Sequence, residues 1–586
     1  MVKRCGIIKI EKQKLKMRRG IMYLFYLTMK TANGLIAIAI LLYILILAIL
    51  SPVLKRKEKY GIVRVMSILP AIAAVIHFAV YGIVCFGHFI FLYIEALIPL
   101  IFLYSGKKPK LRILRSVTSS ILALGVCFVF LINAIGSPMV HNYTRMSYTE
   151  SFKNMLDTLE KEYCLSSWKK IDYDALYKEY LPQVEEAERN NNEIEYAAII
   201  TEVTHKFYDS HTYSYLSQNI DLTTCEYMAG NDYGLSMIRV DDGSVIAVSV
   251  EPNCVANKEG IHNGTTIVAW NGKDIDEAVA ETECCFPGIS FPVKENEDVF
   301  RPMFLAGKGE ECVDITFIND EGAEQTISVK SIDTYYDRLM STYAKLSHLN
   351  TEQRNFHSCM LDNECGYIQI VGESFSPLWD NVAAVRNGYY PKLTEYYADM
   401  IKNLENQGME YLIIDIRNNG GGYDCVAGAL ASLFTEEKKH MVSFGYEDAN
   451  GYHISENQYI YPDGRYKDLP VAVLVNSQCM SAGDGMAKFL GDCDNVTLMG
   501  ITSSSGVNQN NGGYIYLTEN IEVCYPVFLS LSENGTPLID TDNTRENNIT
   551  LDVKIPITRE NAEELFREDN KDIELEYAIE YLQKSN

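Results

Sequence analysis

VAVLVNSQCMSAGDG, residues 471–485, joins a short apolar run to the start of a helical stretch. A continuous apolar run of this length predicts a buried strand of a parallel sheet. The backbone N–H groups of the first helical turn would point toward Ser481, and the helix dipole favours an oxyanion there. The stretch alone leaves two interpretations open. Ser481 is a nucleophile, or its hydroxyl merely caps the helix.

The chain around this turn alternates between strands and helices. Residues 366–371 and 411–416 read as short buried strands, and residues 393–407 read as a helix with Tyr396, Met400 and Leu404 in register. We therefore expect an α/β core over residues 366–560, followed by a C-terminal helix over 561–586. The whole chain is then multidomain, with α/β and α+β parts.

A glycine-rich loop follows the second of these strands, in the sequence DIRNNGGG, residues 415–422. Three glycines let the backbone approach a ligand closely. No Gly-Lys-Ser/Thr follows, so a phosphate-binding P-loop is excluded. Asp415 and Arg417 flank the turn and can pair to fix its shape.

A helical region is predicted between residue 147 and about residue 206. Ser147 and Glu150 have the spacing of a capping box, and apolar residues follow at helical intervals. The region ends in Asp209-Ser210-His211-Thr212-Tyr213, a polar turn. A lone histidine such as His211 is more often structural than catalytic. Beyond residue 233 the pattern changes to short strands and turns.

The first 140 residues have the composition of a membrane region. Residues 31–54 and 116–144 carry no charge, and residues 65–106 are interrupted only by Glu95. A span needs about 20 apolar residues, so we expect about four transmembrane helices. Basic loops at 55–64 and 107–115 should be cytoplasmic under the positive-inside rule, which places everything after residue 140 outside the cell. The basic residues 1–19 conflict with this topology. A translation start at Met29, a fifth short span within residues 20–33 or a cytoplasmic large domain would each resolve the conflict, and we prefer the first.

Charge is divided unevenly along the chain. The whole chain has a net charge of -25, yet residues 1–136 hold 19 basic and 3 acidic residues, so that the remainder has a balance of -41. Phosphate contacts need basic patches, and an acidic body therefore argues against nucleic acid as a partner. The 15 cysteines show no metal-binding spacing, so we predict neither a metal nor another cofactor.

Three motifs taken together resemble the C-terminal processing (tail-specific) serine protease family and its relative, the tricorn core protease. The glycine-rich loop is similar to that family's Asp-Leu-Arg-x-Asn-x-Gly-Gly signature, and Ser481-Ala482-Gly483-Asp484 is similar to its nucleophile motif. The turn at His211 resembles its Asp-x-His-Thr motif. Residues 234–275 are similar to its PDZ-like module.

The resemblance implies a serine-type peptidase, a hydrolase that acts on protein or peptide substrates. It implies domains at 1–140 (membrane region), 147–222 (helical part carrying His211), 226–290 (PDZ-like module), 291–365 (connecting segment) and 366–560 (catalytic core). The implied site residues are the nucleophile Ser481, the base His211, the orienting carboxylate Glu546 with Asp542 in reserve, the oxyanion donors Gly421 and Ala482, and the substrate-binding residues Gly234, Leu235 and Gly420.

Two departures keep other functions open. Many members of the family use a lysine about 25 residues after the serine, and residues 500–509 contain none. The glycine and proline expected near Glu546 are also missing. One alternative is therefore an inactive protease-like protein that binds peptides or signals through the PDZ-like module. The other is a transporter or sensor whose membrane part carries the function. The oligomeric state is not predicted.

Overall fold

The computed structural model describes residues 39–103, 117–127, 139–349, 356–361, 364–374, 388–448, 451–567 and 572–585. The chain divides into two compact units. The smaller, which we call the N-terminal unit, comprises Met1–Tyr163, Glu447–Gly451 and Asn511–Val527. The larger, which we call the main unit, comprises Cys164–Tyr446, Tyr452–Asn510 and Phe528–Asn586.

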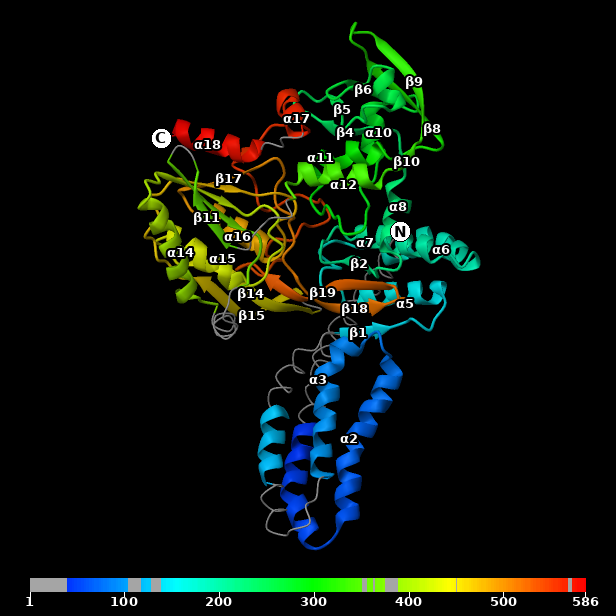
Figure 1. Ribbon diagram of the computed structural model, residues 1–586. Helices are drawn as coiled ribbons and strands as arrows, with labels where there is room; N and C mark the ends of the chain where they lie inside the picture. The colour runs from blue at the N-terminus through cyan, green and yellow to red at the C-terminus, as the bar shows by residue number, and fades with distance from the viewer. Residues whose placement is uncertain are drawn as a thin grey trace, which may run out of the picture. The chain divides into compact units, whose positions relative to one another are not determined.

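The N-terminal unit contains several apolar helices (Figure 1). Two are long and apolar enough to cross a membrane, Ala39–Arg56 and α2 (Tyr60–Tyr81). Two further apolar segments are shorter, Gly87–Leu103, which includes α3 (Phe86–Leu97) and η1 (Ile98–Leu103), and Val117–Cys127. Length and composition thus support two of the four predicted spans. The predicted start at Met29 and the basic residues 1–19 lie outside the described residues.

The rest of the N-terminal unit is a small β/α assembly. Strand β1 (Met139–Asn142) pairs in parallel with β18 (Asn510–Tyr516), and α5 (Tyr148–Glu162) follows it. The Ser147 side chain accepts a hydrogen bond from the Glu150 N–H, which confirms the predicted helix start.

The main unit begins with the predicted helical region. It contains α6 (Tyr173–Arg189), α7 (Glu193–His205), strand β2 (Tyr213–Leu216) and α8 (Asp221–Ala229). Asn192 caps α7 by accepting from the Glu195 N–H, so the predicted helical region is divided into separate helices at this point.

A second sheet follows, with strand order β4-β5-β6-β8-β9 and β7 paired to β6. Its strands are β4 (Ser236–Arg239), β5 (Val245–Val248), β6 (Thr266–Trp270), β7 (Lys273–Asp274), β8 (Cys312–Ile318) and β9 (Glu324–Lys330). Helices α9 (Val255–Lys258), α10 (Ile275–Glu281) and α11 (Lys294–Leu305) belong to the same region, and β3 (Asn231–Asp232) pairs with β10 (Asp333–Thr334) before α12 (Tyr336–Leu346). The predicted boundary at residue 290 cuts this sheet, because β8 and β9 come from the predicted connecting segment.

The α/β core is a six-stranded sheet with the order β11-β12-β13-β16-β17-β20. The strands are β11 (Phe356–Met360), β12 (Cys365–Ile370), β13 (Tyr411–Asp415), β16 (Val471–Leu474), β17 (Val496–Gly500) and β20 (Val553–Lys554). Only the β11–β12 pair is antiparallel among the pairs of this sheet. The buried parallel strands explain the continuous apolar runs of the sequence.

Both faces of the core sheet are buried. Leu412 and Ile414 of β13 face a cluster with α14 (Pro391–Glu405), α15 (Asp424–Ala431) and α16 (Ala482–Gly491), and Ile413 faces a cluster that includes α18 (Ile573–Ser585). Figure 1 shows α14, α15 and α16 on one side of the sheet and α18 on the other. The short helices η2 (Ser432–Phe434) and α17 (Arg559–Leu565) complete the helical layers.

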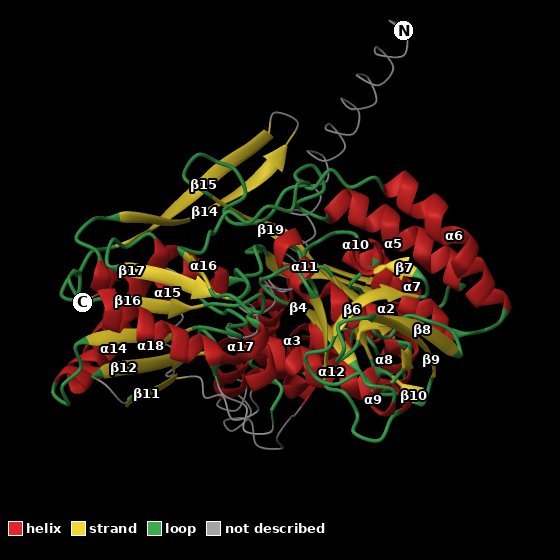
Figure 2. Cartoon of the chain, turned by 90° about the horizontal axis from the view of Figure 1, so that it is seen from above, coloured by secondary structure: helices red, strands yellow, loops and turns green. Residues whose placement is uncertain are grey.

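A further β structure was not predicted from the sequence. Strands β14 (Lys439–Asp448) and β15 (Gly451–Ile460) form the long two-stranded ribbon of Figure 2. β14 also pairs antiparallel with β19 (Ile521–Leu531), where Ser443 lies opposite Leu531.

Candidate active site

Ser481 occupies the sharp turn between β16 and α16. Its backbone has φ 60° and ψ -130°, in a region that non-glycine residues rarely adopt. Such a conformation costs about 1–3 kcal/mol and persists only where the surroundings enforce it. Ser481 stands at the N-cap position of α16, yet among the described contacts its side chain accepts no hydrogen bond from the helix. Ser481 as a residue is partly exposed, and its uncapped hydroxyl favours the nucleophile over the cap.

The glycine-rich loop lies directly against this serine. A Cβ atom placed on Gly421 would come within 2.7 Å of the Ser481 Cβ and 2.9 Å of the Ala482 nitrogen. Gly421 also has φ 89°, so both space and backbone conformation require glycine there. The loop backbone therefore reaches the first N–H of α16, as the predicted oxyanion site requires.

Neighbouring side chains fix the conformation of this loop. The buried Asn419 accepts the Gly421 N–H on its Oδ1 (2.9 Å) and donates from Nδ2 to Glu373 Oε1 (3.3 Å). The Glu373 backbone also donates to the Gly421 carbonyl (2.8 Å). In this conformation the predicted donor Gly421 therefore has its N–H engaged, whereas the Ala482 N–H lies in the first turn of a helix, where no intrahelical acceptor exists. Gly420, the predicted substrate-binding residue of the loop, is exposed.

Arg417 fixes the base of the loop, and the predicted pairing with Asp415 is confirmed. Its Nε lies 3.0 Å from Asp415 Oδ1, and its other nitrogens reach Asp572 (2.6 and 2.8 Å) and Glu574 (3.0 Å) at the start of α18. Burial opposes the charged form of Asp572, but the guanidinium holds the pKa of that carboxyl well below its usual range. His348 approaches the same carboxylates, with Nε2 3.1 Å from Glu574. The guanidinium already supplies their positive charge, so these residues do not favour a metal ion.

His211 lies in the turn after α7 and is buried. Its Nδ1 is 3.9 Å from Asp209 Oδ1 and has no hydrogen-bond partner among the described residues. The Asp209 carboxylate instead accepts the His211 N–H (2.9 Å) and the Thr212 hydroxyl (3.1 Å). Burial lowers the pKa of His211, and Asp209 partly offsets this effect, so the imidazole is neutral at pH 7 and able to accept a proton.

One segment, residues 505–507, joins the histidine turn to the serine turn. Ser210 and Ser505 share a hydrogen bond between their hydroxyls (2.9 Å), the Ser505 N–H donates to the Cys479 carbonyl (2.8 Å), and the Ser481 N–H donates to the Val507 carbonyl (2.9 Å). The structure thus brings the turn that carries His211 and the turn that carries Ser481 to the same short segment. The two residues are 270 positions apart in the chain, so only the fold can unite them.

The sequence reasoning missed a buried charged group beside His211. Lys169 Nζ donates to the Tyr208 carbonyl, the Thr541 carbonyl (both 2.9 Å) and the Thr541 hydroxyl (3.0 Å). Asp540 is completely buried, and its Oδ1 has no partner among the described residues. Burial, followed by the charge of Asp209, raises the pKa of Asp540 to about 7. No local pattern marks either residue in the sequence, because each lies among polar and apolar residues that form no recognisable motif.

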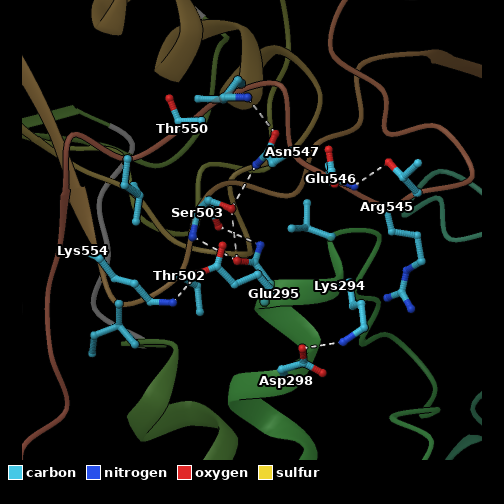
Figure 3. A pocket seen from close by; sticks show the side chains of 16 residues that line it. Lys294, Glu295, Asp298, Thr502, Ser503, Arg545, Glu546, Asn547, Thr550 and Lys554 are labelled. Carbon is cyan, nitrogen blue, oxygen red and sulfur yellow. Dashed lines mark hydrogen bonds and ion pairs between the residues drawn. The ribbon is translucent and has the colours of Figure 1, made fainter. Parts of the chain in front are cut away.

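Glu546, the predicted orienting carboxylate, is not the carboxylate found near the His211 ring. Glu546 is exposed and lines a polar cavity of about 530 Å³ together with Lys294, Ser503 and Asn547 (Figure 3). The reserve candidate Asp542 accepts from the N–H and hydroxyl of Thr544 (both 2.7 Å). The role of Glu546 stays a prediction, and the carboxylate that lies 3.9 Å from His211 Nδ1 belongs to Asp209.

The predicted substrate-binding residues of the second sheet are tightly packed. Gly234 has φ 84°, and its N–H donates to Asp232 Oδ1 (2.7 Å). A Cβ atom there would lie 2.6 Å from the Cys254 Cβ. Leu235 is completely buried. Substrate binding by these two residues stays a prediction.

A serine on a strained strand-to-helix turn, a glycine loop against it and a buried neutral histidine define a serine-hydrolase type of site. Residues 364–555 match the family model for Peptidase family S41, so the chain contains a domain of that family, and the predicted family is confirmed.

The chain is similar to several known proteins in sequence or structure. The carboxy-terminal processing protease CtpA of Bacillus subtilis (strain 168) is 26% identical over 269 residues, which make up 46% of each chain. The chain thus matches about half the length of this curated relative. Mature CPAF is 15% identical with a TM-score of 0.45, and the alignment covers 75% of this chain and 96% of CPAF. The tricorn protease is 14% identical with a TM-score of 0.33, covering 75% of this chain and 37% of that one.

Proposed function

We propose that this chain is a membrane-anchored serine endopeptidase that resembles tail-specific proteases and hydrolyses peptide bonds of protein substrates. The observation that carries the proposal is the conformation of Ser481, held in the left-handed region with its hydroxyl uncapped and the Gly421 backbone against it. A structural N-cap serine needs neither feature, because its side chain would bond to the first helical turn.

The proposed mechanism is acyl transfer. Ser481 Oγ attacks the peptide carbonyl, while His211 accepts the hydroxyl proton and later delivers it to the leaving amine. The Ala482 N–H holds the oxyanion, and Gly421 stays our prediction for the second donor, which requires its N–H to leave Asn419 Oδ1. Losing one such donor typically costs about 3–4 kcal/mol of barrier. Glu546 remains our prediction for the group that orients the imidazole, and Asp209 supports the positive charge that His211 acquires. No cofactor enters this mechanism.

Replacing Ser481 with alanine tests the function. The full chain in detergent should hydrolyse an unstructured protein and be labelled by a fluorophosphonate probe, since only an activated serine reacts with it. Ser481→Ala should abolish labelling and lower the hydrolysis rate at least about 10³-fold. Ser455→Ala serves as control, because Ser455 lies on the exposed β15 strand and bonds only to the Phe444 carbonyl among the described contacts. A wild-type chain that is neither labelled nor active would instead favour the inactive peptide-binding alternative.

We further propose that the chain is a multi-pass membrane protein with its main unit outside the cell. The two long apolar helices and the basic loops of the first 115 residues support this topology. Cys312 is an exposed cysteine of the main unit, so a membrane-impermeant maleimide should label it in intact cells. The Cys312→Ser variant is the control, and it should lack this label. Labelling of Cys312 only after lysis would place the main unit in the cytoplasm.

A further inference from the structure

The Asp484 carboxylate, completely buried in the first turn of α16, binds two backbone N–H groups of the segment beside the serine. Its Oδ1 accepts from Gly506 (3.0 Å) and its Oδ2 from Val507 (3.1 Å). The Val507 carbonyl in turn accepts the Ser481 N–H (2.9 Å). Three residues apart on the same turn, Ser481 and Asp484 are therefore joined through Val507 in a closed ring of hydrogen bonds.

This ring differs from an ordinary capping box. In a capping box the carboxylate at the third helical position accepts the N-cap N–H, and the N-cap hydroxyl bonds to the helix. Here Asp484 stands at that third position, but its oxygens are used by residues 506 and 507, and the Ser481 N–H is given to Val507 instead. The Ser481 N–H is thus bonded by another segment of the chain, and the Ser481 hydroxyl is left uncapped.

The far side of the segment is fixed as well. Gly506 has φ 70°, its carbonyl accepts the Thr541 N–H (3.1 Å), and a Cβ atom on it would meet Thr541 Cγ2 and Val293 Cγ2 at 3.0 Å. The segment therefore cannot move away from Asp484 without breaking contacts on both sides. A strained residue keeps its conformation only when its surroundings over-determine it, and for Ser481 those surroundings are this segment.

We propose that Asp484 is a positioning residue of the active site: through the N–H groups of Gly506 and Val507 it holds Ser481 in the left-handed conformation required for attack. This inference rests on the proposed function, in which Ser481 is the nucleophile. Asp484 touches no substrate in this scheme and acts only through the segment. Asparagine at position 484 has the same shape but replaces one acceptor oxygen by an NH₂ group, which would face a backbone N–H.

The test compares Asp484→Asn with Asp492→Asn in the full chain. Asp492 ends the same helix and forms a surface pair with Lys488 (3.0 Å), so it controls for the loss of one carboxylate from α16. Assays at pH 8.5 keep Asp484 ionised, because burial raises its pKa to about 7. Asp484→Asn should lower kcat and the fluorophosphonate labelling rate about 10²-fold, the usual effect of misplacing a reacting atom by about 1 Å, with KM within about twofold. Asp492→Asn should leave both unchanged.

Three outcomes separate the inference from the function on which it rests. A wild type that is labelled at Ser481 while Asp484→Asn is labelled equally fast would overturn the positioning role and leave the protease intact. A loss confined to KM would overturn it too. A wild type that is not labelled would refute the proposed function itself.

A second variant is available should Asp484→Asn fail to fold. Gly506→Ala strains the same segment from the other side, and it should lower kcat at least about threefold with KM unchanged. A normal kcat would again contradict the inference.

Discussion

Replacing His211 with alanine is expected to lower kcat about 10³-fold while the fold is retained, because a general base typically contributes 10²–10⁴-fold. The histidine sits in a turn, its side chain is buried, and its Nδ1 makes no hydrogen bond with described residues, while the neighbouring Ser210 contacts the segment that holds Ser481. Hydrolysis of an unstructured protein by the full chain in detergent, at matched circular dichroism, measures the effect.

The rival base is a lysine. Position 506, where dyad enzymes of the resembled family carry one, is a glycine with no room for a side chain. The buried Lys169 directs its Nζ at three oxygen acceptors, an arrangement that suits an ammonium group with three donors and leaves no lone pair for catalysis. Lys488→Ala, at an exposed pair on α16, should change the rate less than about twofold. If Lys169→Met abolished activity at retained fold while His211→Ala kept near-normal rates, the Ser–His assignment would be wrong.

The pH dependence of activity follows from the same assignment. A base must be neutral, and burial lowers the pKa of His211 below its ordinary value of about 6.5, so the imidazole loses its proton already in mildly acidic solution. The carboxyls of Asp484 and Asp540, with pKa values raised to about 7, add ionisations near neutrality. The value of kcat/KM should therefore rise from pH 5 and level off by about pH 8, rather than climb toward a lysine-like value of about 10.4.

Removing Arg417 should have the largest effect on stability. Its guanidinium is buried and forms ion pairs with Asp415, Asp572 and Glu574, which ties the glycine loop to α18. Breaking such a buried network by removing one partner leaves carboxylates uncompensated and typically costs about 3–5 kcal/mol. Arg417→Met should therefore lower the apparent Tm of the full chain by about 10 °C and also lower peptidase activity.

A matched control is available on the surface. Arg465 also forms ion pairs with two carboxylates, Glu395 and Asp463 (2.7 Å each), but its side chain is 37% exposed. Exposed pairs contribute at most about 1 kcal/mol, so Arg465→Met should shift the Tm by no more than about 3 °C. Equal shifts for the two variants in thermal denaturation would contradict the role assigned to the buried network.

Local sequence patterns predicted many of the elements but few of their partners. The capping box at Ser147 and the apolar runs at β13 and β16 were readable, because each depends on residues within one or two turns of each other. The second sheet shows the limit. β8 and β9 alternate as ordinary strands and pair with each other, and nothing local says that β8 also pairs with β6, which lies more than 40 residues earlier.

The sequence by itself determined the family motifs, the apolar N-terminal helices and the placement of Ser481 between a strand and a helix. Only the tertiary structure decided that the Ser481 hydroxyl is uncapped, that Asp484 and Val507 hold its backbone, and that Ser210 meets Ser505 across 295 residues. It also decided that Glu546 is exposed while Asp540 is buried. The reason is physical. Periodicity and capping act between neighbours in the chain, whereas burial, charge compensation and backbone strain depend on atoms that only the fold brings together.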